Sequence, residues 1–369
     1  MTRPNWDNCL VHFDDEAMSV LTEYFGRPDR HCLLIAGAGF DPRATYVAQA
    51  IAPVMKDRLE ALLIREERGI AADNLKSAGD SSESTLVALI PKSQVERIDI
   101  FSSVDQAPVG GPRIVDILRK RSWPKELTDI ILDVSALSIG ISFPVARFLI
   151  DTFEDKEVNV HIVIASDPDL DAQIRKEPSS KPIFVKGFLG ENATSSPLAP
   201  AQIWLPHLAN DSELSLRTIY VDLGDIYKIC PILPFPARWP RRPDDLIAEY
   251  SEILLDEWEI SARDFLYVSE WNPLDSYRAL KTLKKRYVRT VENVYAPRIV
   301  ISPIGSKVMA IGAMMAAIEC EMSVKYIETI RYEVISQEPL RSNTANIKLV
   351  HIWADGPVYS GLKSRSVKL

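Results

Sequence analysis

The stretch HCLLIAGAGFDPRATYVAQAI, residues 31–51, decides the fold class of this chain. It opens with the apolar run CLLIA at 32–36, passes through a loop with two glycines and continues into a helical pattern. A continuous apolar run of this length is typical of a strand covered on both faces, as in a parallel sheet. Strand, tight loop and helix in this order predict one unit of an α/β fold.

The loop GAGFDPR in this stretch has two readings. Gly37 and Gly39 allow a sharp turn and a close approach of the backbone to a ligand, and Arg43 could hold a phosphate through two hydrogen bonds. Asp41, however, is also a good helix N-cap, with Pro42 at the first helical position. Because Pro42 stands where the dinucleotide motif has its third glycine, the loop does not point to NAD.

Similar apolar runs, each ending in small or polar residues, recur along the chain. In the first half they cover 85–91, 96–102, 129–135 and 158–166, with helical patterns at 43–66, 112–121 and 142–154. In the second half they cover 217–224, 264–270, 297–303, 324–334 and 347–353, with helical patterns at 243–259, 273–289 and 305–320. We therefore predict an α/β protein of tandem Rossmann-like, doubly wound, mostly parallel sheets.

The texture of the sequence changes in the middle of the chain. Residues 171–215 are rich in Pro, Ser and Asn and show no sustained period, which predicts an irregular linker or insertion. We expect an N-terminal Rossmann-like half at 1–170 and a C-terminal Rossmann-like half at 216–369.

Ligands of open α/β sheets bind beyond the carboxyl ends of the strands, so the loops after the other strands are candidates too. After the run at 129–135, Asp133, Ser135 and Ser138 precede a helix, and small hydroxyl groups can surround a phosphate or a ribose. The alternative is structural, with Ser142 serving only as a helix N-cap.

A third loop follows the run at 264–270. Glu270 stands at the end of a buried strand, where a carboxylate needs a partner or a substrate. Asn272 is either a ligand group or the N-cap of the next helix.

The fourth loop, SPIGSK at 302–307, carries the best candidates for holding an anion. Ser302 ends a strand, and Gly305, Ser306 and Lys307 open a very apolar helix. Free amides, a hydroxyl and a cation together suit an anion. A lysine in the first turn opposes the helix dipole, and residues that break such a rule are enriched at functional sites; the alternative is a lysine that only faces solvent.

Composition excludes several classes of protein. A net charge of −8 argues against a protein whose whole surface grips nucleic acid, so direct nucleic-acid binding is not expected. Four cysteines and five histidines lie far apart, and this scatter predicts neither a metal site, nor a disulfide framework, nor a cofactor. The chain has no signal-peptide pattern and no long apolar run, so we expect a cytoplasmic protein that does not enter a membrane.

At the loop SPIGSKVMAIGAMMAAIE the chain resembles the CRISPR-associated Rossmann-fold (CARF) sensors and the related SAVED sensors of bacterial nucleotide-signalling defence. The likeness is carried by Ser302, Gly305, Ser306 and Lys307, with Gly37, Gly39 and Ser135 as vaguer counterparts. The resemblance implies a nucleotide ligand bound at strand-end loops and an antiviral role. Those sensors usually carry an effector in the same chain, and since none is recognisable here, a partner protein would have to supply it.

Three functions remain open from the sequence. The first is a nucleotide-binding sensor or accessory protein, with the strand-end loops of both halves facing one cleft. The second is an enzyme acting on nucleosides, nucleotides or phosphosugars, with Glu270 or Asp133 as general acid or base and Lys307 or Arg43 as an anion clamp. The third is a structural or adaptor subunit, for which the Trp- and Arg-containing segment PFPARWPRRPDD would serve an interface.

Overall fold

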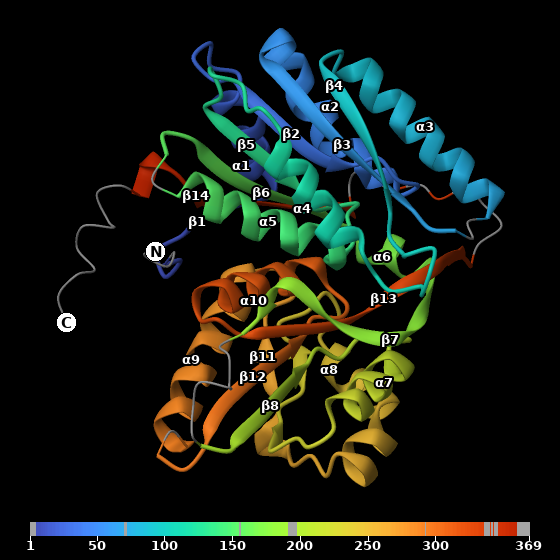
Figure 1. Cartoon of the computed structure of the whole chain (residues 1–369), viewed down its shortest axis with the longest axis vertical. Coiled ribbons are helices and arrows are strands. Elements are labelled where there is room, and N and C mark those ends of the chain that lie inside the picture. The colour runs from blue at the N-terminus through green and yellow to red at the C-terminus, as the bar shows by residue number, and fades with distance from the viewer. Residues whose placement is uncertain are drawn as a thin grey trace. The chain divides into compact units, whose positions relative to one another are not determined.

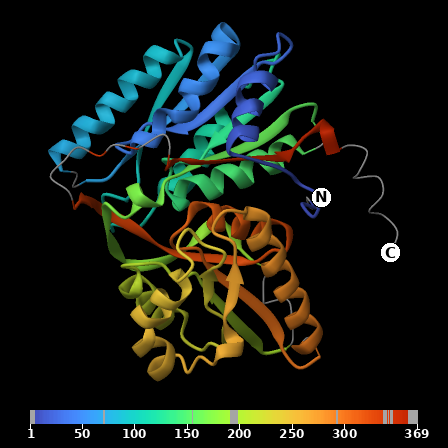
Figure 2. The same ribbon diagram turned by 180° about the vertical axis from the view of Figure 1, so that it is seen from behind.

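The computed structural model describes residues 5–69, 72–154, 156–190, 198–291, 293–335, 340, 342 and 346–359. The chain forms two compact units, which Figures 1 and 2 show from opposite sides. Unit 1 consists of Met1–Asp7 and Pro178–Thr329, and unit 2 consists of Asn8–Glu177 and Ile330–Leu369. Each unit is therefore assembled from two separate segments of the chain.

Unit 2 is built on a seven-stranded sheet with the order β1-β14-β6-β5-β2-β3-β4. The strands are β1 (Leu10–Phe13), β2 (Cys32–Gly37), β3 (Leu59–Glu67), β4 (Ser93–Asp99), β5 (Asp129–Asp133), β6 (Asn159–Ser166) and β14 (Lys348–Asp355). The five strands from β6 to β4 are parallel, whereas β14 and β1 are antiparallel to their neighbours. The chain adds β3 and β4 on one side of β2 and then β5 and β6 on the other. This is the Rossmann order, and its topological switch point lies between β2 and β5.

Successive side chains of a strand point to opposite faces of the sheet, and in the central strands both sets are buried. Helices therefore cover both faces of this sheet. They are α1 (Asp14–Ser19), the π-helix η1 (Val20–Tyr24), η2 (Pro42–Thr45), α2 (Tyr46–Met55), η3 (Lys56–Arg58), α3 (Asp73–Leu89), α4 (Gly110–Lys120), α5 (Ile139–Phe153) and α6 (Pro168–Asp171). Leu34 and Ala36 of β2 share a core with α1, η1, α2 and α3. Figure 1 shows α4 and α5 side by side on the near face, and a Cβ on Gly111 would lie 2.6 Å from the carbonyl oxygen of Gly140.

Unit 1 contains a five-stranded sheet, β7-β13-β12-β8-β9, and a two-stranded sheet, β10-β11. The strands are β7 (Ile174–Leu189), β8 (Pro200–Pro206), β9 (Lys228–Ile229), β10 (Ile232–Pro234), β11 (Leu266–Val268), β12 (Ala296–Ser302) and β13 (Ser323–Val334). A parallel bridge between His207 and Ile232 joins the end of β8 to β10. Relative to β8, the chain lays β10 and β11 on one side and then β12 and β13 on the other. Unit 1 thus repeats the Rossmann order, with its switch point between β8 and β12.

The helices of unit 1 are α7 (Glu213–Leu223), α8 (Arg242–Glu249), the π-helix η5 (Ile253–Glu257), η6 (Ala262–Asp264), α9 (Pro273–Val291) and α10 (Lys307–Glu319). Every residue of α10 from Val308 to Ile318 is buried, as is typical of a helix that is apolar on all sides. A Cβ on Gly312 would lie only 2.0 Å from the carbonyl oxygen of Pro273, so α10 approaches the start of α9 closely. The middle of α10 is thus packed against the start of α9.

The predicted fold class is confirmed, since both units are α/β with mostly parallel sheets in the Rossmann order. Three segments form a different element from the one predicted. Residues 85–91 include the end of α3, and the strand beside β2 is β3, within the segment 43–66 that was predicted as helical. A short apolar run such as LEALLI has no period that separates a strand from a helix.

Residues 217–224, predicted as a strand, form α7 with Gly224 as its C-cap. Leu216 and Ile219 are buried three residues apart on one side of the helix, whereas Val221 is 77% exposed. Packing of this helical face overrides the β-propensity of the segment.

The domain boundaries of the structure also differ from the prediction. Residues 171–215 hold β7, β8 and the start of α7 rather than an irregular linker. The strand β14, within the predicted half 216–369, belongs to unit 2, where it pairs with β6. Long-range strand pairing of this kind leaves no local signal in the sequence.

Candidate functional site

At the switch point of unit 2, the first glycine of the loop GAGFDPR is explained by packing. A Cβ on Gly37 would lie 2.9 Å from the carbonyl oxygen of Ala136, in the loop after β5. A Cβ on Gly39 would meet nothing within 4 Å. Gly37 is therefore needed for the approach of two loops to each other, and Gly39 faces open space.

Arg43 is engaged within unit 2. Its guanidinium donates to both carboxylate oxygens of Asp41 and to Asp171 Oδ1, at 2.6–3.2 Å. Burial opposes the charge of Arg43, but the two carboxylates more than offset this and raise its pKa. Asp41 also caps η2, accepting from the Arg43 amide. Asp41 thus caps the helix, and the anions that Arg43 binds are carboxylates of the protein itself.

The polar groups of the loop after β5 are likewise hydrogen-bonded to other groups of the protein. Asp133 Oδ1 accepts from the amide and the hydroxyl of Ser135, and the Ser135 hydroxyl oxygen accepts from the Ala165 amide at 2.7 Å. These bonds hold the ends of β5 and β6 together. Asp133 and Ser135, predicted as general acid or base and ligand group, are both part of this framework.

At the amino end of α5 a carboxylate already stands where an anion would bind. The Ser138 amide donates to Glu66 Oε1 at 2.7 Å, and Glu66 also pairs with Arg68 at 2.6 Å. The buried Ser138 hydroxyl has no hydrogen-bond partner among the described residues. Sequence analysis missed Glu66, although its place at the end of β3 could have drawn attention to it.

Unit 1 has a different arrangement at its switch point, centred on His207. This residue follows β8 directly, is fully buried, and donates its amide to Ser302 O at 3.0 Å. Among the residues that the structure describes, neither ring nitrogen has a hydrogen-bond partner. Burial lowers the pKa of His207 to about 3, so the ring is neutral near pH 7.

The predicted residues of the fourth loop lie beside His207. The Ser302 hydroxyl accepts from Trp204 Nε1 at 2.9 Å, which anchors the end of β12 in the core. Gly305 has a φ of 97°, and a Cβ there would lie 2.7 Å from the Cβ of Ala209. Ser306 is the N-cap of α10, and Lys307 is its first residue. The loops after β8 and β12 therefore meet at the amino end of α10.

The loop after β11 joins the same edge of the sheet. The Ser306 hydroxyl lies 3.5 Å from Glu270 O, and the Glu270 carboxylate accepts from the Arg238 amide at 3.0 Å. Asn272 Oδ1 accepts from the Leu274 amide, as an N-terminal cap of α9 does. Unit 1 thus brings together Glu270, Asn272, Ser302, Gly305, Ser306 and Lys307. Sequence reasoning missed His207 because it assigned that residue to the linker, yet an apolar run, AQIWLP, immediately precedes it.

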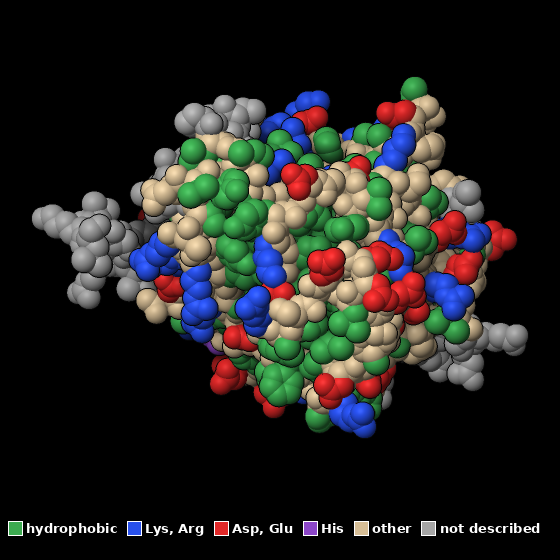
Figure 3. All heavy atoms as spheres, turned by 90° about the horizontal axis from the view of Figure 1, so that it is seen from below, with side chains coloured by type: hydrophobic (Ala, Val, Ile, Leu, Met, Phe, Trp, Pro, Cys, Tyr) green, Lys and Arg blue, Asp and Glu red, His purple; other side chains and the backbone are tan. Residues whose placement is uncertain are grey.

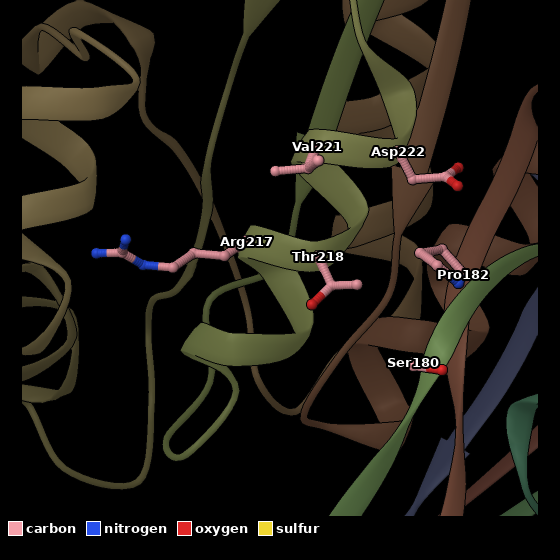
Figure 4. A pocket seen from close by; sticks show the side chains of 6 residues that line it. All are labelled: Ser180, Pro182, Arg217, Thr218, Val221 and Asp222. Carbon is pink, nitrogen blue, oxygen red and sulfur yellow. The ribbon is translucent and has the colours of Figure 1, made fainter.

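A shallow hollow of about 390 Å³ lies elsewhere on unit 1 (Figure 4). Side chains of β7 and α7 line it: Ser180, Pro182, Arg217, Thr218, Val221 and Asp222. Arg217 is paired with Glu213 and Glu257, and Asp222 is paired with Lys325. The charged groups of the hollow are thus already neutralised, and none of the predicted site residues line it.

Composition also led to expectations about a metal site, a membrane-spanning segment and the surface charge. In the described part of the chain, no cluster of three or more His, Cys, Asp or Glu side chains could hold a metal ion. No helix in the described ranges is both long and apolar enough to cross a bilayer. On the face shown in Figure 3, basic and acidic side chains occur among one another.

No protein-family model matches the chain, and no curated protein sequence matches it. Among solved structures, it is similar to the NH3-dependent NAD synthetase from Campylobacter jejuni subsp. jejuni NCTC 11168 in complex with the nitrate ion. The sequence identity is 14%, the match covers 85% of this chain and 94% of that chain, and the TM-score is 0.20. At this TM-score the likeness carries no information on the function of the chain.

Proposed function

We propose that the chain binds a phosphate-bearing small molecule, of the nucleotide class, in unit 1 at the switch point between β8 and β12. The observation that carries this proposal is His207, a fully buried ring with two nitrogens that lack partners among the described residues. A buried polar group without a partner costs about 1–3 kcal/mol, and a ligand at this position, where ligands of this fold bind, would supply the missing partners.

The chemistry of the neighbouring groups fits an anion. A neutral His207 ring has one N–H to donate and one nitrogen to accept, which suits a phosphate oxygen and a hydroxyl. The Ser306 hydroxyl already accepts from the Met309 amide, and the amino end of α10 carries partial positive charge. Lys307 adds a full positive charge at the same end. An anion here would interact favourably with all three.

Binding is favoured over catalysis by the state of the two candidate carboxylates. Glu270 accepts a backbone hydrogen bond from Arg238, and Asp133 accepts two from Ser135. Both carboxylates hold loops in place. We therefore propose a sensor or accessory protein, and the resemblance to CARF and SAVED sensors extends the proposal to a signalling nucleotide, an antiviral role and an effector supplied by a partner protein.

The test is a binding screen on the full chain with inorganic phosphate, mononucleotides, dinucleotides and cyclic oligonucleotides, read by thermal shift and calorimetry. We expect at least one nucleotide to bind. His207→Leu and Lys307→Ala should each weaken its affinity about tenfold or more, a loss of about 1.4 kcal/mol. Ser261→Ala is the matched control, because Ser261 caps η6, before β11 rather than after it.

Two results would count against this proposal. If no compound of the screen binds, or if both variants bind as tightly as the wild type, the site between β8 and β12 is not the binding site. If a nucleotide is turned over and Glu270→Ala abolishes the turnover, the protein is an enzyme instead.

A further inference from the structure

Four polar side chains form a continuous ladder across the sheet of unit 2, away from any residue discussed above. They are Asp129, His161, His351 and His12, contributed in this order by the neighbouring strands β5, β6, β14 and β1. His161 Nε2 lies 3.1 Å from Asp129 Oδ1, and His161 Nδ1 lies 2.9 Å from His351 Nε2. His351 Nδ1 lies 3.0 Å from His12 Nδ1. Each successive pair is thus within hydrogen-bond distance.

The ladder leads from the interior toward solvent. Asp129, His161 and His351 are fully buried, whereas His12 on the edge strand β1 is only half-buried. His12 and His351 are direct partners in the register of β1 and β14. His12 is therefore the ring through which the ladder can exchange protons with water.

Asp129 is held as a carboxylate at the inner end. Its oxygens accept from Tyr24, Asn159 and Thr128 as well as from His161, at 2.5–3.1 Å. Although burial opposes its ionisation, these donors, led by His161, lower its pKa. Asp129 must therefore accept, and this fixes the direction of every bond in the ladder.

The remaining groups around the ladder do not supply a competing proton. Arg30 Nη1 lies 3.8 Å from Asp129 Oδ2 and donates to the Tyr24 hydroxyl. Burial, together with the charge of Asp129, raises the pKa of both Tyr24 and Cys32, so both stay protonated near neutral pH. Trp353 is a neutral neighbour, and its ring lies 4.7 Å from that of His161 in a tilted arrangement.

The positions of the ring protons follow from these bonds. His161 must donate through Nε2, so its Nδ1 accepts from His351 Nε2–H. His351 Nδ1 then accepts from His12 Nδ1–H. Burial lowers the pKa of His161 and His351, so both rings are neutral before the ladder takes up a proton. Every neutral ring thus has one assigned tautomer, and the only nitrogen left for an additional proton is His12 Nε2.

We infer that this ladder is a proton-binding site that takes up one proton for its three rings and shares it along the chain of hydrogen bonds. A proton from water binds His12 Nε2. His12 then passes its Nδ1 proton to His351 Nδ1, His351 passes its Nε2 proton to His161 Nδ1, and Asp129 retains the His161 Nε2–H bond. The first N–H bond forms as an O–H bond of hydronium breaks and water leaves, and each later N–H bond forms as another N–H bond breaks. The positive charge is thus shared along the ladder, between His12 at the surface and the Asp129 carboxylate at the inner end.

The capacity of the site is one proton. With one extra proton, all three hydrogen bonds of the ladder survive. A second proton would have to occupy a nitrogen that already accepts a hydrogen bond, and it would place two N–H groups face to face. Like charges at this distance also oppose it. Since the His12–His351 pair joins the edge strand β1 to β14, the second proton would weaken that pairing.

The experiment is a pH titration of the full chain labelled with 15N-histidine, followed by long-range 1H–15N spectra. At high pH we expect the Nε2–H tautomer for His161 and His351 and the Nδ1–H tautomer for His12. On acidification the signals of the three rings should shift together, with one shared midpoint. His31, outside the ladder, serves as the internal reference for the spectra.

His12→Asn is the decisive variant, because the asparagine amide can still donate to His351 Nδ1 but cannot take up a proton. It should keep the Nε2–H tautomers of His161 and His351 and abolish their shared midpoint. An Nε2–H tautomer for neutral His12, or three rings that titrate at separate midpoints, would overturn the inference. A shared midpoint that persists in His12→Asn would equally overturn it.

Discussion

Replacement of His207 by leucine should make the ligand-free protein more stable. Leucine is close to histidine in size, and it removes one donor and one acceptor that have no partner among the described residues. Each unsatisfied buried group costs about 1–3 kcal/mol, so the gain in the free energy of unfolding of unit 1 should be about 2 kcal/mol or more. The same substitution removes the polar group that the proposed ligand would bind. Stability should therefore rise while affinity falls.

The pH dependence of the free energy of unfolding gives a second, independent test of His207. The pKa of His207 falls from its ordinary value of 6.5 to about 3 in the folded state. The unfolded chain thus binds more protons than the folded chain between these values, so this residue's contribution is complete above pH 6.5 and is lost as the pH falls. At pH 5 the loss is about 2 kcal/mol, from about 1.4 kcal/mol for each pH unit below 6.5. His207→Leu should remove this part of the pH dependence.

The assay is urea denaturation of wild type and His207→Leu at pH 7 and pH 5, with hydrogen exchange of the β8 and β12 amides to assign the transition to unit 1. His31→Leu, at a partly exposed position in unit 2, is the control and should change stability by less than about 0.5 kcal/mol. A His207→Leu protein that is less stable than wild type at pH 7, with the pH dependence unchanged, would refute the reasoning.

Four further substitutions test the roles assigned to loop residues. Gly37→Ala should cost about 1–3 kcal/mol through overpacking against the loop after β5, whereas Gly39→Ala should be nearly neutral, and thermal denaturation of the pair compares them directly. Arg43→Ala leaves Asp41 and Asp171 without their shared cation and should lower the stability of unit 2 by about 3–5 kcal/mol, measured by urea denaturation. Ser302→Ala leaves the buried Trp204 Nε1–H without its hydrogen-bond acceptor and should lower the free energy of unfolding by about 1–3 kcal/mol. An unchanged urea midpoint would contradict that role.

A loop pattern in the sequence predicts where the candidate residues lie along the chain but not which groups they pair with. The four predicted strand-end loops do follow strands β2, β5, β11 and β12. The pattern could not reveal that Asp171, 128 positions along the chain from Arg43, would take up that guanidinium. Nor could it reveal that Glu66 would occupy the amino end of α5. A loop pattern names candidate groups by residue type, but their partners depend on which strands become neighbours.

The histidine ladder shows the same limit more sharply. His12, His161 and His351 are separated by well over a hundred residues, and each alone is indistinguishable in sequence from a core or surface histidine. They meet only because β14 inserts between β1 and β6. His207 likewise becomes unusual only when burial removes its access to water.

By itself, the sequence determined the alternation of strands and helices and hence the α/β class, because that alternation rests on local periodicity and on turn residues close to each other in the chain. The very apolar stretch after Lys307 and the Gly-Ser-Lys start of α10 were also legible, since both are local. The tertiary structure alone decided the strand order of the two sheets, the passage of β14 into unit 2, and which polar groups are paired or left without a partner. Those outcomes depend on contacts between distant segments, and the free energy of such contacts is set by burial and geometry that no short window of sequence contains.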